Sequence, residues 1–240
     1  MKILAVGCHP DDLEIECYGT LAKYVKQGHE VYICGVSNGD QGHYRIMPEE
    51  LAKIRFEEAK AASQLIGAKE YVNLGGHDTK ISRYDKKLED KLIDYIRKIC
   101  PDLIITQYPD DYMSDHNETS ALVFNAAFNA TLPHLCTEGN GLPEKVPSLI
   151  PIYYMCPSSK HNFKPTHFVD ITEEIDLKLQ AMKCHKSQLE WLSEHDGTDS
   201  LDGIRAWSIA YGKILGVKYA EAFVPCMHDC RLSTKNLLPQ

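Results

Sequence analysis

Apolar and polar positions follow two alternating periods along the first hundred residues, and each change of period marks a new element. Residues 2–8 form a short apolar run, and residues 13–25 then carry apolar side chains at helical spacing. Gly28 ends this predicted helix, and residues 31–36 form a second apolar run after a short connection. The order predicts a strand, a helix and a second parallel strand joined by a right-handed crossover.

The same alternation continues to residue 106. Pro48 opens a helix that ends near Gly67, and residues 71–74 form a third strand. A further helix carries apolar positions from Leu88 to Ile99, and residues 103–106 form a buried strand. Strands that alternate with helices predict an α/β fold, a three-layer α/β/α sandwich with a mostly parallel, Rossmann-like sheet.

The pattern is less regular from residue 131 to about residue 170, where prolines are frequent and residues 152–155 form the one predicted strand. We expect loops over one rim of the sheet here, and we expect them to determine substrate specificity. A helix over residues 173–193 and a last strand over residues 220–224 follow. Because we find neither an internal repeat nor a linker, we expect a single domain over residues 1–240. The irregular region also offers a surface for assembly into a homo-oligomer.

Composition and charge exclude several classes of protein. Hydrophobic residues make up 43% of the 240 residues and charged residues 25%, as in an ordinary globular chain. The net charge of -8 and the lack of a basic cluster argue against nucleic-acid partners. No apolar stretch approaches the roughly 20 residues that span a bilayer, and no leader pattern follows Met1, so we expect a cytoplasmic protein without a membrane partner. The nine scattered cysteines, Cys226 and Cys230 included, are expected to be free thiols.

The candidate chemistry lies where predicted strands end. His9-Pro10-Asp11-Asp12 directly follows the first strand, at the edge where open α/β sheets bind ligands. Helix capping explains one acidic residue there, but it does not require an imidazole and two carboxylates in one turn. The segment 111–116 follows the fourth strand, next to the switch point of a doubly wound sheet. His9, Asp12 and His116 can therefore converge, and two histidines with one carboxylate are a catalytic zinc arrangement.

With these motifs the sequence resembles the zinc-dependent LmbE-like or PIG-L-like de-N-acetylases over most of its length. The most specific element is the family's His-Pro-Asp-Asp motif at residues 9–12. Further agreement is found at Ser37-Asn38-Gly39-Asp40-Gln41-Gly42, at Arg55 with Glu58, at His185-x-Ser187-Gln188 and at Glu221-Ala222-Phe223. The resemblance implies a zinc-dependent N-deacetylase that acts on an N-acetylglucosamine-type amino sugar or conjugate.

The resemblance also implies roles for individual residues. His9, Asp12 and His116 would hold one zinc ion per chain, and Asp11 would act as the general base. Zinc lowers the pKa of bound water to about 7, so Asp11 can take the proton of this water and later return it to the leaving amine. Asp115, beside His116, is expected to orient a ring nitrogen in the site as a supporting carboxylate.

Met113 departs from the family pattern, which commonly has a histidine three residues before the last metal ligand. A thioether cannot donate to the oxyanion as that histidine does. Three explanations stay open: zinc alone stabilises the oxyanion, Tyr112 or His185 donates instead, or the chemistry is impaired or altered. We predict an active enzyme in which Tyr112 or His185 substitutes. The alternative is a catalytically lapsed protein that binds a sugar or a nucleotide sugar on the same fold.

The remaining candidates are less specific. Arg55 is a candidate for substrate binding, although an ion pair with Glu58 on the same helix explains it equally well. Asp78 follows the third strand, where a contact to sugar hydroxyls and a role in a turn are equally compatible with its position. His185 fits a half-buried structural histidine as well as a site residue. No G-x-G-x-x-G follows the first strand, which disfavours a dinucleotide enzyme.

Overall fold

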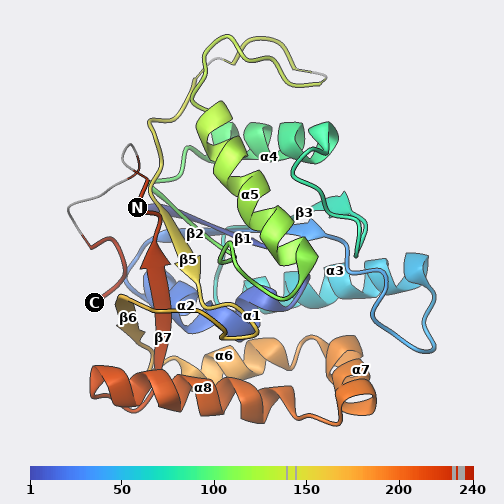
Figure 1. Ribbon diagram of the computed structural model, residues 1–240, viewed down its shortest axis with the longest axis vertical. Helices are drawn as coiled ribbons and strands as arrows, with labels where there is room; N and C mark the ends of the chain where they lie inside the picture. Colours follow the sequence, from blue (N-terminus) through green and yellow to red (C-terminus); the bar gives the residue numbers. More distant parts are fainter. Residues whose placement is uncertain (139, 144, 229–230, 232–235) are drawn as a thin grey trace.

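The structure, a computed structural model, describes residues 1–138, 140–143, 145–228, 231 and 236–240. Within these residues, seven strands form one sheet in the order β3-β2-β1-β4-β5-β7-β6 (Figure 1). The strands are β1 (Lys2–Gly7), β2 (Glu30–Ser37), β3 (Glu70–Gly76), β4 (Leu103–Thr106), β5 (Ile152–Met155), β6 (His167–Asp170) and β7 (Ala220–Pro225). The helices are α1 (Asp12–Glu16), α2 (Tyr18–Lys26), α3 (Pro48–Leu65), α4 (Lys86–Ile99), α5 (Ser114–Asn129), α6 (Ile175–Met182), α7 (Lys186–Asp196) and α8 (Ser200–Leu215).

The sheet separates two hydrophobic cores, which gives the predicted three layers. Successive side chains of a strand point to opposite faces, and β1 shows this directly: Ile3 and Ala5 pack in one core, while Leu4 and Val6 pack in the other. In Figure 1, α4 and α5 lie on one side of the sheet, and α1, α2, α6 and α8 lie on the other. Strands buried on both faces are apolar throughout, which is why β1 and β4 were recognisable in the sequence.

The predicted fold class is confirmed. The five strands β1 to β5 pair in parallel, and the chain reverses its direction of winding between β1 and β4, as predicted. The carboxyl ends of these two strands therefore lie side by side, which is the switch point at which such sheets bind ligands. β7 runs antiparallel to both β5 and β6, so the sheet is mostly, not wholly, parallel.

Several predicted elements differ from those observed. The helix expected over residues 13–25 is divided at Cys17, whose φ of -144° is not helical, and the helix expected over residues 173–193 is divided into α6 and α7. β6 and α8 were not predicted. Four residues of β6 are too few for an alternating pattern. The buried residues of α8, Ile204, Ser208, Tyr211 and Gly212, have helical spacing, but serine and glycine among them weaken the apolar pattern.

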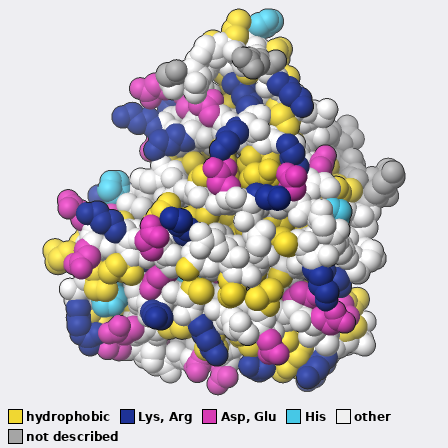
Figure 2. All heavy atoms as spheres, turned by 180° about the vertical axis from the view of Figure 1, so that it is seen from behind, with side chains coloured by type: hydrophobic (Ala, Val, Ile, Leu, Met, Phe, Trp, Pro, Cys, Tyr) yellow, Lys and Arg dark blue, Asp and Glu magenta, His cyan; other side chains and the backbone are white. Residues whose placement is uncertain are grey.

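Side chains of both charges are distributed over the described surface. Figure 2 shows basic and acidic side chains interspersed over one face, and the described side chains there form no extended basic patch. In the described part of the chain, no helix combines the length and the apolar character that a bilayer span requires. Cys226 is a free thiol, whereas Cys230 lies outside the described residues.

Candidate metal centre and active site

The turn after β1 places the His-Pro-Asp-Asp motif at the switch point. Asp11 precedes α1 with a φ of 143°, and Asp12 is the first residue of that helix. A positive φ is uncommon for a residue with a side chain and persists only where the surroundings enforce it. His116 reaches the same place from the first turn of α5, beyond the end of β4. Two segments about a hundred residues apart thus meet at the ends of adjacent strands.

Three ligand atoms at this place have the spacing of a metal site. His9 Nδ1 lies 3.5 Å from Asp12 Oδ2, and His116 Nε2 lies 3.3 Å from each of these two atoms. A tetrahedral ion bound at 2.0–2.2 Å would separate its ligands by about 3.3–3.6 Å. All three side chains are buried, so the triangle is held by its surroundings. The three predicted ligands therefore fit one small cation such as zinc.

The electrostatics of the three residues also favour a cation. Burial opposes ionisation of Asp12, but the charge and hydrogen bonds of His116 and His9 outweigh it and hold the pKa of Asp12 well below its usual range. Burial likewise opposes a charge on His116, yet Asp12 and Asp111 raise its pKa to about 11. Surroundings that stabilise a positive charge at this point stabilise a divalent cation in the same way. The donor set of nitrogen and carboxylate oxygen is the one that zinc uses in catalytic sites.

Carboxylates and an amide hold the three ligands in place. Asp12 Oδ2 accepts hydrogen bonds from the backbone N–H of His9 at 2.7 Å and from Gln107 Nε2 at 2.9 Å. His116 Nδ1 lies 3.0 Å from Asp111 Oδ2, which leaves Nε2 to face the site. Partners of this kind fix the orientation of a metal-binding ring. Neither Gln107 nor Asp111 was among the predicted site residues, although Asp111 lies in the segment 111–116 that follows the fourth strand.

The position of Asp115 refines its predicted role. Asp115 Oδ2 accepts a hydrogen bond from the backbone N–H of Thr79 at 2.6 Å and lies 3.4 Å from His9 Nε2. The carboxylate beside His116 is Asp111, five residues earlier. One turn of chain offers both acidic residues, and spacing alone does not tell which of them reaches which ring. Asp115 thus faces His9, not the histidine that follows it in the sequence.

The other predicted carboxylate, Asp11, lies against a buried arginine. Arg55 donates to Asp11 Oδ1 at 3.1 Å, to the carbonyl of Pro10 at 2.9 Å and to the carbonyl of Gly39 at 3.0 Å. Burial raises the pKa of Asp11 to about 6, although the Arg55 charge opposes this shift. A carboxyl group with a pKa near neutrality can exchange a proton readily.

This arrangement excludes the alternative explanation of Arg55. Glu58 does not pair with Arg55, because its carboxylate accepts hydrogen bonds from the backbone N–H and the hydroxyl of Ser187. The guanidinium group of Arg55 is buried and also lines the cavity. It donates to one carboxylate, that of Asp11, and to two backbone carbonyls, those of Pro10 and Gly39. Its first structural role is therefore to fix Asp11 and this turn.

Asp78 reaches the site from the loop after β3. Its Oδ1 lies 3.1 Å from His9 Nε2, and its backbone N–H donates to Asp40 Oδ1 at 3.1 Å. Asp40 also holds His77, whose Nδ1 lies 2.8 Å from Asp40 Oδ2. Asp78 lines the cavity, as expected for a substrate-binding residue, and Asp40 supports the loop that carries it. Cys8 Sγ lies 3.7 Å from His9 Nε2, so a cysteine also borders the metal-binding residues.

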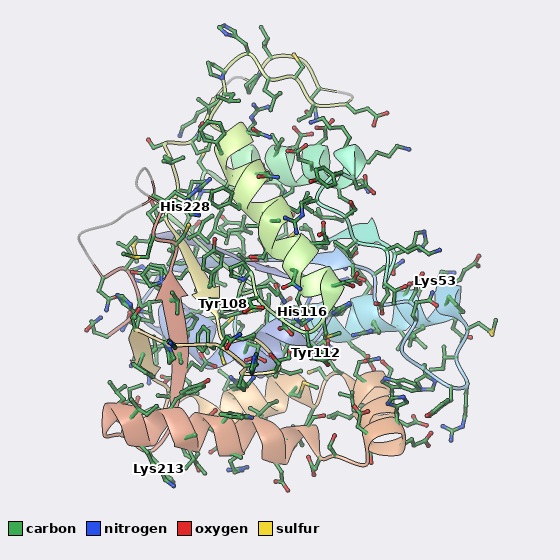
Figure 3. The ribbon with its side chains drawn as sticks, viewed as in Figure 1. Lys53, Tyr108, Tyr112, His116, Lys213 and His228 are labelled. Carbon is green, nitrogen blue, oxygen red and sulfur yellow. The ribbon has the colours of Figure 1, made fainter. Side chains whose placement is uncertain are left out.

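The two proposed substitutes for the missing histidine lie in different surroundings. Tyr112 is 74% exposed and lines the cavity, and Figure 3 shows it at the same end of α5 as His116. His185 is completely buried, its Nε2 lies 3.0 Å from Glu14 Oε1, and it is absent from the cavity wall. The expectation that His185 donates to the oxyanion is therefore corrected, because its ring faces a buried carboxylate instead of the substrate cavity.

One cavity of about 500 Å³ joins these residues. The expected specificity region, residues 131–170, contributes Cys156, Ser158 and Lys160 to its wall. Helices α7 and α8 contribute more residues to the wall than this region does. Substrate specificity is therefore expected to depend also on α8, a helix that the sequence pattern did not predict. The signals for α8 were its ends: Asp199 accepts hydrogen bonds from two backbone N–H groups of the first turn, and Gly216 closes the helix with a φ of 83°.

Comparison with known proteins agrees with this geometry. The family model PIG-L, described as GlcNAc-PI de-N-acetylase, matches residues 4–127. The diacetylchitobiose deacetylase of Thermococcus kodakarensis is 28% identical in an alignment of 241 positions, which covers 95% of this chain and 86% of that relative. The 1D-myo-inositol 2-acetamido-2-deoxy-alpha-D-glucopyranoside deacetylase of Actinosynnema mirum is 22% identical and covers 78% of this chain and 81% of its own length.

A solved structure supports the same relationship. The N,N'-diacetylchitobiose deacetylase from Pyrococcus horikoshii superimposes with a TM-score of 0.79 and 28% sequence identity. The superposition covers 94% of this chain and 83% of that chain. The similarity thus extends over the strands and helices that surround the cavity, beyond the segment of the family match.

Proposed function

The chain belongs to the PIG-L family of de-N-acetylases, and from this premise we propose that it uses one zinc ion to remove the N-acetyl group of an N-acetylglucosamine-type amino sugar or conjugate. Both relatives named above act on substrates whose names include an acetylated amino sugar. The observation that carries the proposal is the triangle of His9, Asp12 and His116 ligand atoms at one end of the cavity. Asp11 lies beside this triangle with a pKa suited to proton transfer.

His9, Asp12 and His116 would hold the zinc ion, which when bound polarises a carbonyl oxygen and acidifies water. Three protein ligands are the number that catalytic zinc sites provide, in contrast to the four of structural sites. Asp111 and Gln107 keep His116 and Asp12 in place, so the ligands need little rearrangement when the ion binds. A site built in advance in this way is what a catalytic metal requires.

Asp11 moves the protons of the reaction. Arg55 holds its Oδ1, so Oδ2 is the atom that accepts a proton from the attacking water as the new C–O bond forms at the amide carbonyl carbon. The same proton then passes from Asp11 to the amide nitrogen as the C–N bond breaks. The products are acetic acid and the free amine, which exchange a proton at neutral pH to give acetate and the ammonium form, and Asp11 returns to its starting charge. The Arg55 charge stabilises the carboxylate before and after this exchange.

Tyr112, directly before Met113, is the remaining donor for the oxyanion in place of the histidine that the family has at position 113. Partial desolvation of the hydroxyl and the neighbouring Asp111 raise the pKa of Tyr112, so the hydroxyl keeps its proton at neutral pH and can donate it in a hydrogen bond. Its exposure allows the ring to move onto a bound substrate. Asp78, on the opposite loop, would accept hydrogen bonds from the hydroxyls of the sugar.

The proposal also covers the compartment and the binding partners of the protein. The described cysteines are free thiols, which supports a reducing compartment such as the cytoplasm. A small-molecule amino sugar is the expected partner, without nucleic acid and without a membrane, and the region 131–170 is a candidate surface for assembly into a homo-oligomer.

The decisive test is release of primary amine from a panel of N-acetylated sugars and sugar conjugates, with zinc-loaded and chelated protein in parallel. We expect release only from the zinc-loaded protein and loss of release in Asp11→Asn at unchanged zinc content. Full activity of Asp11→Asn, or equal activity after chelation, would overturn the proposal. Tight binding of these sugars without turnover at any pH would favour the alternative that Met113 suggests, a lapsed sugar-binding protein.

A further inference from the structure

The cavity continues from the metal-binding residues along one side of α8. The residues of α8 that line it are Ser200, Gly203, Ile204, Trp207, Ser208 and Tyr211, which recur every three or four positions and so form one helical face. The wall also contains Ile15, Cys156 and Ala222, of which Cys156 and Ala222 belong to one apolar cluster with Tyr211. We call this part of the cavity the α8 arm, defined by Ile15, Cys156, Ile204, Trp207, Tyr211 and Ala222. The side chains of these six residues are apolar apart from the Tyr211 hydroxyl, the Cys156 thiol and the Trp207 indole N–H.

The charged residues beside the α8 arm are already paired. Lys160 Nζ lies 2.9 Å and 3.0 Å from the two carboxylate oxygens of Glu16, and Lys178 Nζ lies 2.5 Å from Glu221 Oε1. All four side chains are mostly or completely buried, and all four residues line the cavity. Two cations against two anions leave this wall neutral. An anionic group of a ligand would therefore have to break an existing ion pair, which disfavours a phosphate or a carboxylate here.

The hydroxyl and thiol groups at the arm are also occupied. The Tyr211 hydroxyl lies 2.8 Å from Cys156 Sγ, and the Ser208 hydroxyl donates to the carbonyl of Ile204 at 2.8 Å. A second sugar ring would bring several hydroxyl groups into the arm and find few free partners for them. Buried hydroxyls without partners cost binding free energy, whereas an apolar group gains from contact with this wall. The arm thus favours an apolar group over a second sugar.

Gly203 keeps the wall of the arm open. It lies in the first half of α8, where glycine destabilises a helix by about 1 kcal/mol relative to alanine. A Cβ atom at this position would meet no atom within 4 Å, so no neighbour of the protein requires glycine. Trp207, one turn further and 46% exposed, places an indole ring at the edge of the same space. The helix thus leaves room beside an aromatic side chain.

We propose that the α8 arm binds a neutral apolar group, aliphatic or aromatic, that the amino sugar substrate carries. The inference rests on the proposed function for the sugar end of the ligand. Two attachments present the same chemistry, a glycosidic substituent at the anomeric carbon or an acyl chain longer than acetyl on the nitrogen. In both cases the amide lies at the metal-binding residues while the apolar group extends along α8.

Binding to chelated protein tests the arm without any turnover. Calorimetry would compare the methyl and hexyl glycosides of N-acetylglucosamine, N-hexanoylglucosamine methyl glycoside and diacetylchitobiose. Complete burial of each added methylene tightens binding by up to about fourfold, so we expect at least about a tenfold gain for one of the two hexyl-length ligands over the methyl glycoside. The ligand that gains identifies the attachment. Equal affinities throughout, or tighter binding of diacetylchitobiose than of both hexyl-length ligands, would overturn the proposal.

Substitutions at Gly203 test whether the tighter binding of hexyl-length ligands arises in the α8 arm. Gly203→Phe fills the arm, so the ratio of affinities between the hexyl-length and methyl ligands should fall to near one. Gly203→Ala adds only a Cβ and should keep most of the ratio. Ala206→Phe places the same ring on the exposed outer face of α8 and should leave the ratio unchanged. An unchanged ratio in a folded Gly203→Phe protein would place the apolar group elsewhere and overturn the assignment. If a hexyl-length ligand binds more tightly but no amine is released from any substrate, the proposal for the α8 arm is supported and the proposed deacetylation is not.

Discussion

Arg55 and Asp11 form a buried pair in which the arginine holds both the general-base candidate and the turn that carries it. One guanidinium nitrogen, Nη2, donates to Asp11 Oδ1 at 3.1 Å and to the carbonyl of Pro10 at 2.9 Å. Asp11 has a φ of 143°, so the turn needs such external support. The same contact leaves the second oxygen of Asp11 for proton transfer. The geometry of the reaction therefore depends on a residue of α3, far from the motif in the sequence.

Arg55→Lys tests this dependence. Lysine keeps the charge but cannot make several directed contacts from one planar group. Because small displacements of a catalytic group are costly, we expect kcat to fall by about tenfold to a hundredfold, with the zinc content unchanged. Steady-state kinetics with metal analysis of the same samples would measure both. A normal kcat would show that Asp11 keeps its position without the arginine.

Asp111 and Asp115 allow a matched comparison of two carboxylates near the metal-binding residues. Asp111 lies 3.0 Å from His116 Nδ1, so Asp111→Asn should weaken zinc binding by about tenfold to a hundredfold. Asp115 lies at the longer distance of 3.4 Å from His9, which Asp78 also supports, so Asp115→Asn should weaken it less. Competition with a chromophoric chelator measures both affinities. The reverse order would mean that Asp115 is the principal supporting carboxylate.

The strands and the motifs beside them were predictable because burial on both faces makes β1 and β4 apolar throughout. Their adjacency follows from the handedness of the crossovers, and it places His9, Asp12 and His116 together. α8 was not predictable in this way, because its inward face borders the cavity as well as the core and carries Gly203, Ser208 and Trp207 beside the core residue Ile204. The capping residues Asp199 and Gly216 were the sequence signals that mark the two ends of α8.

Choices between neighbouring polar residues were also beyond the sequence. Arg55 had Asp11 and Glu58 as partners that charge alone could not distinguish, and the structure shows that Ser187 occupies Glu58. His185 has helical spacing compatible with the cavity, but the course of the chain between α6 and α7 turns its ring to Glu14. The partners of Arg55 and His185 depend on packing between distant segments, which local periodicity in the sequence does not report.

Tyr112→Phe tests the substitute donor for the oxyanion. Removal of one donor costs up to about a hundredfold to a thousandfold in kcat where no metal shares the charge, so with zinc present we expect a loss of about tenfold to a hundredfold at similar KM. Met113→His should restore part of this loss in the double variant, because it returns a donor to the position that the family uses. An unchanged kcat in Tyr112→Phe would assign the whole stabilisation to the metal.

The Lys178–Glu221 pair makes a prediction about stability. Both side chains are about 2% exposed, and Glu221 also accepts hydrogen bonds from the backbone N–H groups of Gly19 and Thr20. Lys178→Met leaves a buried carboxylate without its counter-charge, so the free energy of unfolding should fall by about 3–5 kcal/mol. Urea unfolding would measure it. The double variant Lys178→Met with Glu221→Gln should recover part of the loss, and a further loss would contradict this account.

The Arg83–Glu118 pair predicts how stability depends on pH. Arg83 joins the loop after β3 to α5 through both carboxylate oxygens of Glu118, and these hydrogen bonds lower the pKa of Glu118 below its ordinary value of 4.5. A carboxyl group with a lowered pKa in the folded state stabilises that state above its unfolded pKa and loses this contribution as the pH falls through the folded pKa. The pair is partly exposed, so Glu118→Gln should cost no more than about 1 kcal/mol at pH 7. In thermal unfolding, the difference between the variant and the unmodified protein should therefore shrink below a pH of about 4.5 and vanish at lower pH. A difference that grows on acidification would have the wrong sign for this pair and would point to another acidic group of the loop.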